Sequence, residues 1–254
     1  NLVSGNLTVN DPGVATNITN PTGVGIQARN TASGTMNFGN TNVSGSGGTG
    51  VVLGTTGNGN AGAITFADLD IAPDSGQRAF QATENTGALT ASSGTVTTTN
   101  NTAVEISGTS NGSRTPLNFR LTTVAVTGGS AAPNGIKLLN TSATGSPGGF
   151  RVLGNGGTCT NATPTCTGGQ IANTTGADGA SGGAAIRLDN VDTVVLTRMR
   201  LNDHVNYAIR GINVNGFTLD TSVAHGVIGT NEGAPHSEGA INFDGTGSGF
   251  PGLA

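Results

Sequence analysis

AIRLDNVDTVVLTRMRLNDHVNY (residues 185–207) is followed directly by AIRGINVNGFTLDTSVAHGV (residues 208–227), and the second stretch repeats the first at a distance of 23 residues. The shift places Ile209 on Ile186 and Leu219 on Leu196. Apolar residues recur two positions apart within each stretch, which is the period of a half-buried β-strand. A fixed repeat that lays apolar residues on apolar residues is typical of a solenoid, in which each repeat covers its neighbour. A repeat this short, built from strands and tight turns, predicts one coil of a parallel β-helix.

The beginning of this repeat can be recognised eight times along the chain. Each copy has a small residue, an inward aliphatic residue or Phe, an outward residue, a second inward residue and then a turn. The copies begin at Gly25, Gly50, Ala79, Ala103, Gly135, Ala185, Ala208 and Ala240. The sequence therefore predicts an all-β protein, a right-handed parallel β-helix (β-solenoid) of about eight coils. The hand is expected because parallel crossover connections are almost always right-handed.

A second pattern follows most of these starts: two apolar residues two apart, a gap of two residues, and two more apolar residues two apart. It occurs at Ile64–Ile71, Phe119–Val126 and Val194–Leu201. The gap reverses the alternation of the side chains, so a bend or bulge must separate two strands there. Each coil is therefore predicted to have three faces and one sharp corner.

Asparagine recurs at the turn that follows the first strand of the repeat, at Asn30, Asn140, Asn190 and Asn213. Asn tolerates the left-handed backbone conformation, and it can hydrogen-bond its own backbone or another Asn stacked on it. Chance would scatter these residues instead of placing them in one column. We therefore expect the four to form a short asparagine ladder.

The composition favours one elongated domain. Gly makes up 44 of the 254 residues, aromatic residues 4% and charged residues 9%, and Trp is absent. Such a chain cannot build a thick globular core, but small β-branched side chains can fill a narrow, regular interior. We expect a single β-helix domain over residues 1–254, with an irregular first coil at 1–24 and a loop insertion at 145–183. The chain begins with Asn1 instead of Met, which favours a segment of a longer chain.

Charge and cysteine content exclude several classes of partner. The net charge of −4 is thinly spread, and no basic cluster is present to attract a nucleic acid or an anionic membrane. No apolar run approaches the roughly 20 residues of a membrane helix. Cys159 and Cys166 lack the neighbouring His or Cys of a zinc motif, so we predict no metal and no cofactor. They fit a local disulfide formed in an oxidising, exported setting, with reduced thiols as the alternative.

The coils AIRLDNV…VVLTRMRL and AIRGINVNGFTL resemble the right-handed parallel β-helix repeats of the pectin-lyase-like superfamily. They are similar especially to the non-enzymatic repeats of large exported bacterial proteins, such as autotransporter passengers and adhesins. The resemblance covers about Gly25 to Gly245 and lies in architectural motifs. It implies export, a rod shape, and binding or enzymatic surfaces built on the exterior faces.

Polysaccharide-cleaving enzymes of this fold carry carboxylates close together on an exterior face, where a pair can supply acid and base. Asp189 and Asp244 are one candidate pair, because they share an exterior column two coils apart, although Ile212 lies between them. The alternative interpretation is a charged, solvated face. The paired Asp and Arg-x-Lys motifs of the superfamily's polygalacturonases are missing here.

Asp203 and His225 are the second catalytic candidate. The 23-residue shift places His225 over Asn202, so its ring is expected within reach of Asp203 on the neighbouring coil. A His–Asp pair can act as a general base. The alternative is a polar corner with a surface His bonded to its neighbour.

The sequence thus predicts a structural or adhesive rod of an exported bacterial cell-surface or extracellular protein. Its expected partners are surface glycans or other copies of itself, with no nucleic acid and no membrane span in this segment. The first alternative is a carbohydrate-active enzyme, either a polysaccharide lyase or a glycoside hydrolase. The second is a self-assembling fibre subunit, because uncapped solenoid ends can stack head to tail.

Overall fold

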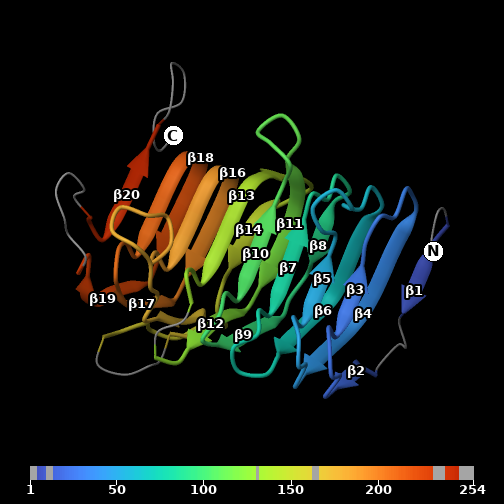
Figure 1. The fold of residues 1–254 in the computed structure, drawn as a ribbon, viewed down its shortest axis with the longest axis horizontal. Coiled ribbons are helices and arrows are strands. Elements are labelled where there is room, and N and C mark those ends of the chain that lie inside the picture. Colours follow the sequence, from blue (N-terminus) through green and yellow to red (C-terminus); the bar gives the residue numbers. More distant parts are fainter. Residues whose placement is uncertain (1–4, 10–13, 130–131, 162–165, 231–237, 246–254) are drawn as a thin grey trace.

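The chain forms a stack of parallel β-coils. The computed structural model describes residues 5–9, 14–129, 132–161, 166–230 and 238–245. Over these ranges it contains twenty strands joined in one continuous sheet and no helix. The coils follow one another along the long axis, from the N-terminal end, blue in Figure 1, to the C-terminal end, red. This arrangement confirms the predicted all-β parallel solenoid of about eight turns; the right hand stays a prediction.

Each coil has three faces, which we call A, B and C in chain order. Face A carries the eight sequence copies described above, one strand from each coil. Its strands are β3 (Ile26–Ala28), β5 (Val51–Leu53), β7 (Phe80–Thr83), β10 (Val104–Ser107), β13 (Ile136–Ala143), β16 (Ile186–Thr197), β18 (Ile209–Asp220) and β20 (Ile241–Asp244). Each pairs in parallel with the next, and Ile209 lies opposite both Ile186 and Ile241.

Faces B and C complete each coil. Face B consists of β1 (Leu7–Val9), the first parts of β4 (Thr35–Ser44) and β6 (Ala63–Ala72), then β8 (Leu89–Ala91), β11 (Thr115–Leu121), β14 (Gly149–Val152), and the second parts of β16 and β18. Face C consists of β2 (Thr16–Thr19), the second parts of β4 and β6, then β9 (Thr95–Thr99), β12 (Thr123–Thr127), β15 (Gly169–Ala172), β17 (Met199–His204) and β19 (Val223–Ile228). Between β16 and β17 the bend falls at Arg198, whose φ is 57°.

Two strands lie inside residues 145–183, which the sequence analysis predicted to be a loop insertion. Strand β14 pairs with β11 and β16, and β15 pairs with β12 and β17, so the coil continues through this segment. Phe150, Val152 and Ile171 are fully buried there. The pattern is hard to recognise because glycines flank these short strands and long connections separate them. The long excursions are the connections on either side of β15.

The interior is a set of columns of buried side chains. Ile186 and Ile209 are fully buried, whereas Ile241, in the same column, is 48% exposed on the last described strand of face A. On face B, the rings of Phe119 and Phe150 stack with their centroids 6.1 Å apart. The starting position of each coil requires a small residue, because a Cβ on Gly50 would lie 2.7 Å from the carbonyl oxygen of Ala79 on the next coil.

Replacing Ile209 by Asp tests this register. The carboxylate would enter a dry interior without a partner, and we expect the free energy of unfolding to fall on the order of 4–5 kcal/mol. That loss is comparable to the whole stability of many domains. Thr218→Asp is the matched control, since Thr218 lies exposed on the same strand and should change stability by about 0.5 kcal/mol or less. Denaturant unfolding measures both variants, and equal losses would contradict the assignment of Ile209 to the interior.

Candidate functional site

Three of the four asparagines predicted as a ladder are bonded to one another. Asn190 donates from Nδ2 to Oδ1 of Asn140 at 3.2 Å, and Asn213 donates in the same way to Asn190 at 3.1 Å. All three have φ between 50° and 53°, the left-handed conformation that the turn after face A requires. Asn30 occupies the same turn with φ 56°, but it lies four coils from Asn140, and the three intervening coils carry Thr55, Glu84 and Gly108 in this column. It is therefore not part of the bonded ladder.

Cys159 and Cys166 form a disulfide, with their Cα atoms 4.3 Å apart. The bridge closes a short loop in the connection between β14 and β15, and residues 162–165 within that loop lie outside the described residues. This connection leaves the coil and returns to it, and Sγ of Cys159 lies 3.3 Å from the carbonyl oxygen of Met199 on face C, so the disulfide restrains an excursion that contacts the coil stack.

Asp203 is a corner residue between face C and the connection that follows it. Its φ is 60°, and its Oδ1 accepts a hydrogen bond from the backbone N–H of Val227 on the next coil at 3.0 Å. Asn100, with φ 62°, does the same on earlier coils, where its Oδ1 accepts from the N–H of Gly129 at 3.0 Å. Asp203 thus holds two neighbouring coils together in the way that an asparagine does elsewhere.

His225 lies opposite Asn202 in the ladder, as the 23-residue shift predicts, but its exposed ring makes no hydrogen bond with Asp203 among the described contacts. The carboxylate is engaged by the Asn202 amide, at 2.8 Å, and by the Val227 N–H. These two hydrogen bonds lower the pKa of Asp203, and the bond from Asn202 has the larger effect. A stably ionised carboxylate that already accepts these bonds suits a structural corner better than an acid or a base.

His204 follows Asp203 in the sequence and belongs to the same predicted polar cluster, and it is the buried histidine of this corner. Asp203 has a left-handed backbone conformation, and the His204 side chain that follows it points inward, so that it is 1% exposed. Its Nδ1 lies 2.8 Å from Oγ1 of Thr174, and that hydroxyl donates to the carbonyl oxygen of Gly183 at 2.8 Å. Because Thr174 has a single proton to give, its oxygen must accept from Nδ1–H of His204. This assignment leaves Nε2 as a bare acceptor, and Nε2 is buried without a hydrogen-bond partner among the described residues.

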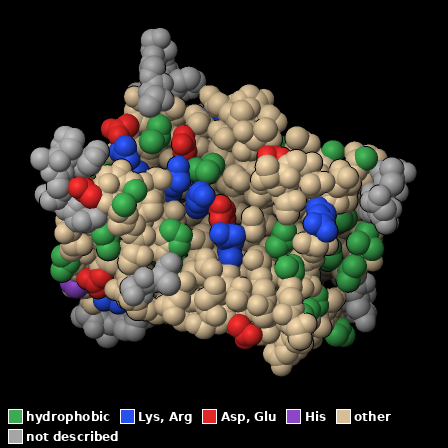
Figure 2. Space-filling view, in the orientation of Figure 1, with side chains coloured by type: hydrophobic (Ala, Val, Ile, Leu, Met, Phe, Trp, Pro, Cys, Tyr) green, Lys and Arg blue, Asp and Glu red, His purple; other side chains and the backbone are tan. Residues whose placement is uncertain are grey.

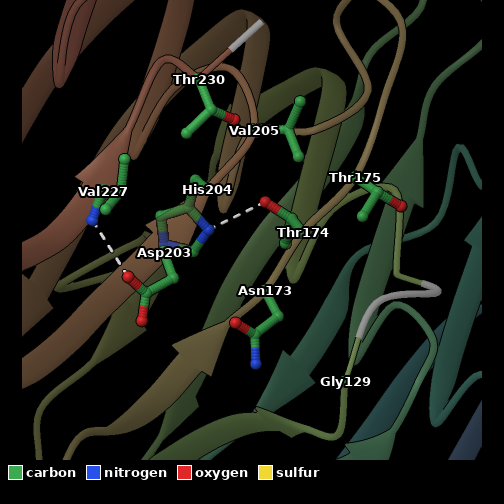
Figure 3. Close-up of a pocket in the computed structure, with 9 residues that line it drawn as sticks. All are labelled: Gly129, Asn173, Thr174, Thr175, Asp203, His204, Val205, Val227 and Thr230. Atoms are coloured by element: carbon green, nitrogen blue, oxygen red, sulfur yellow. Dashed lines mark hydrogen bonds between the residues drawn. The ribbon is translucent and has the colours of Figure 1, made fainter.

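The His204 corner borders a shallow pocket of about 240 Å³. Figure 3 shows the imidazole pointing toward Thr174 while the Asp203 carboxylate points away from it, toward the N–H of Val227. The lining residues are Gly129, Asn173, Thr174, Thr175, Asp203, His204, Val205, Val227 and Thr230. Burial lowers the pKa of His204 to about 4, against a smaller opposing effect of the Asp203 charge. The ring is therefore neutral near pH 7.

Asp189 and Asp244 lie in one exterior column on either side of Ile212, as predicted. Asp244 forms an ion pair with Arg210, and Asp189 accepts a hydrogen bond from the Asn190 amide at 2.9 Å. The two carboxylates are thus occupied separately, with an aliphatic side chain between them. They do not form a pair that could act as general acid and general base.

A line of charged side chains follows the neighbouring exterior column of face A. Glu105, Lys137, Arg187 and Arg210 stand opposite one another on consecutive coils, and Figure 2 shows a line of blue and red side chains across the molecule in this view. Glu105 forms ion pairs with Lys137, at 2.9 Å, and with Arg78, at 3.0 Å.

Arg187 differs from its neighbours in this line. It is half-buried between Lys137 and Arg210, and its guanidinium makes no ion pair or hydrogen bond with any described residue. Burial lowers the pKa of Arg187, whereas the charges of Asp189 and Glu105 oppose that shift from beyond ion-pair distance. A cation held between two cations, with unused N–H donors, is a point at which an anion can bind.

Comparison of the chain with protein-family models, with curated proteins and with solved structures finds no match. Within the described ranges there is no group of three or more His, Cys, Asp and Glu side chains that could hold a metal ion. A search of the same residues for helices long and apolar enough to cross a membrane finds none.

The buried His204 predicts a pH dependence of stability. Its pKa is about 4 in the folded chain and about 6.5 when unfolded, so the unfolded state binds more protons between these values. The contribution of the neutral ring is complete above about pH 6.5 and is lost as the pH falls toward 4, by up to about 3 kcal/mol. Unfolding free energies measured across this window should fall less steeply with decreasing pH in His204→Gln than in the unmodified chain.

Thr218→Gln is the control for that measurement, because Thr218 is exposed and carries no titratable group, so this variant should keep the pH dependence of the unmodified chain. An NMR titration of the His204 ring in the folded protein gives a second readout. Titration of that ring near 6.5 would contradict the burial of its Nε2.

Proposed function

We propose that this chain is a structural and adhesive rod of an exported bacterial cell-surface or extracellular protein, and that face A binds surface glycans that carry anionic groups. The observation that carries the proposal is the unpaired, half-buried guanidinium of Arg187 in an otherwise paired line of charges. A continuous solenoid suits a rod, because its length and stiffness come from repeated coil-to-coil pairing.

The surroundings of Arg187 fit a sugar that carries a carboxylate or sulfate. The planar guanidinium of Arg187 can bind such a group through two parallel hydrogen bonds. Leu139 and Ile212, both half-buried, lie in the adjoining exterior column on the coils before and after Arg187 and offer apolar surface to the C–H face of a sugar ring. Lys137 and Arg210 are each ion-paired with a carboxylate, so the guanidinium of Arg187 is the donor left available to a negatively charged chain along the rod.

The family resemblance and the disulfide support the exported setting. The parallel solenoid is the architecture of the repeats that the coils resemble, and a disulfide persists in oxidising compartments.

A polysaccharide-cleaving enzyme receives less support. Asp203 is held by two hydrogen bonds, and Ile212 separates Asp189 from Asp244.

Binding to immobilised glycans tests the adhesive face. The chain should bind glycans rich in uronic acid or sulfate over neutral ones, and Arg187→Gln should weaken that binding about tenfold, since a hydrogen bond between charged groups contributes roughly 1.5–3 kcal/mol. Arg120→Gln is the matched control, because Arg120 lies exposed on face B without a partner among the described residues. Equal binding of acidic and neutral glycans, or equal losses in both variants, would refute the proposal.

A further inference from the structure

A two-residue turn projects from the coil stack between β10 and β11, in the green loop beside β11 in Figure 1. Ser110 and Ser113 close the turn through two backbone hydrogen bonds of 3.4 and 3.0 Å, and Asn111 and Gly112 form its exposed tip. The N–H of Gly112 makes no hydrogen bond with any described residue, and a Cβ on Gly112 would meet nothing closer than Oγ of Ser110, at 3.9 Å. Solvent and space for a rearrangement are therefore both available at the peptide bond between Asn111 and Gly112.

The guanidinium of Arg114 is directed at Asn111. Its Nε donates to the side-chain Oδ1 of Asn111 at 2.8 Å and to the backbone carbonyl oxygen of the same residue at 3.2 Å, and its Nη2 also donates to Oδ1. Because a guanidinium can only donate, the side-chain oxygen of Asn111, and not its NH2 group, must face it. Nη1 forms an ion pair with Asp192 at 3.0 Å, so each nitrogen of the guanidinium has a partner.

These contacts polarise both groups that react when an asparagine is deamidated. In that reaction the backbone nitrogen of the following residue loses its proton and attacks the side-chain carbon Cγ. The deprotonated peptide shares its negative charge with the backbone carbonyl oxygen of the asparagine, and the attack then moves negative charge to Oδ1. Arg114 donates to both of these oxygens, so it stabilises the charge in each place where it develops, as the donors of an oxyanion hole do.

We propose that Asn111 is a site of self-catalysed deamidation, with Arg114 as the catalytic residue and water as the second reactant. The nitrogen of Gly112 forms a bond with Cγ of Asn111, and the side-chain nitrogen leaves as ammonia, so that a cyclic imide remains. Water opens the imide at either carbonyl, and residue 111 becomes aspartate or its β-linked isomer. The product adds one negative charge to a chain of net charge −4 and places it beside Arg114. This modification is independent of glycan binding, which is assigned to Arg187.

A second Asn-Gly pair in the chain has the opposite surroundings. Asn58 is exposed and closes a tight turn, and Gly59 follows it. The charged group in contact with this turn is the carboxylate of Glu84, which accepts from the N–H of Gly57 at 2.7 Å. Gly59 is pressed against the next coil, since a Cβ there would lie 1.8 Å from the carbonyl oxygen of Glu84. We therefore expect the folded structure to slow deamidation at Asn58 and to accelerate it at Asn111.

Peptide mapping by mass spectrometry during incubation near neutral pH tests the proposal in the full 254-residue chain. In the folded chain, Asn111 should be converted about tenfold faster than Asn58 or more, because hydrogen bonds from a charged donor act on its reaction alone. In guanidinium chloride, where the chain is unfolded, both pairs lose their surroundings and the two rates should become similar. A ratio of the two rates that is the same in the folded and the unfolded chain would contradict the proposal.

Arg114→Gln separates catalysis by the guanidinium from the exposure of the turn. This variant should convert Asn111 about tenfold more slowly than the unmodified chain when folded, and at the same rate when unfolded. Arg120→Gln is the matched control, because it removes a cation that makes no contact with Asn111 among the described residues, and it should keep the rate of the unmodified chain. Conversion in folded Arg114→Gln that is as fast as in the unmodified chain, or faster, would overturn the inference.

Discussion

Each coil of this chain can bury its apolar side chains only against the coils on either side of it. A single turn of roughly two dozen residues encloses a narrow interior that is open above and below, and parallel pairing with two neighbours closes it. Ile186 and Ile209 are fully buried because a described coil lies on each side of them. Ile241 is exposed because it has a described coil on one side. Hydrogen bonds between coils and burial of side chains therefore form together, and neither is available to an isolated turn.

The corners impose a second requirement, because a chain that turns sharply between flat faces must adopt left-handed backbone conformations. Of the twelve described residues other than Gly with a positive φ, seven are Asn. The same residues supply side-chain bonds between coils, as in the ladder from Asn140 to Asn213 and at Asn100. Asp203 belongs to this class, and this explains why an acidic residue beside two histidines is not organised as a catalytic group.

The fold could be predicted from the sequence because inward residues alternate strictly in the strands that begin each coil, and the 23-residue repeat aligns two coils directly. Strands β14 and β15 escaped prediction because the two apolar residues of each are set among glycines and long connections. The inward orientation of His204 was also not predictable, since the left-handed backbone of Asp203 interrupts the regular alternation of the strand just before it. The free guanidinium of Arg187 depends on which neighbours pair with one another, which a column of charges alone does not reveal.

Amide hydrogen exchange of the native chain, followed strand by strand, tests the dependence of each coil on its neighbours most directly. At concentrations at which the chain is monomeric, protection should be highest in the central coils on all three faces, around β10 to β13, and should decline toward both ends, where a coil has one neighbour instead of two. Fast exchange along a whole face, or a terminal coil as protected as the central ones, would contradict the account.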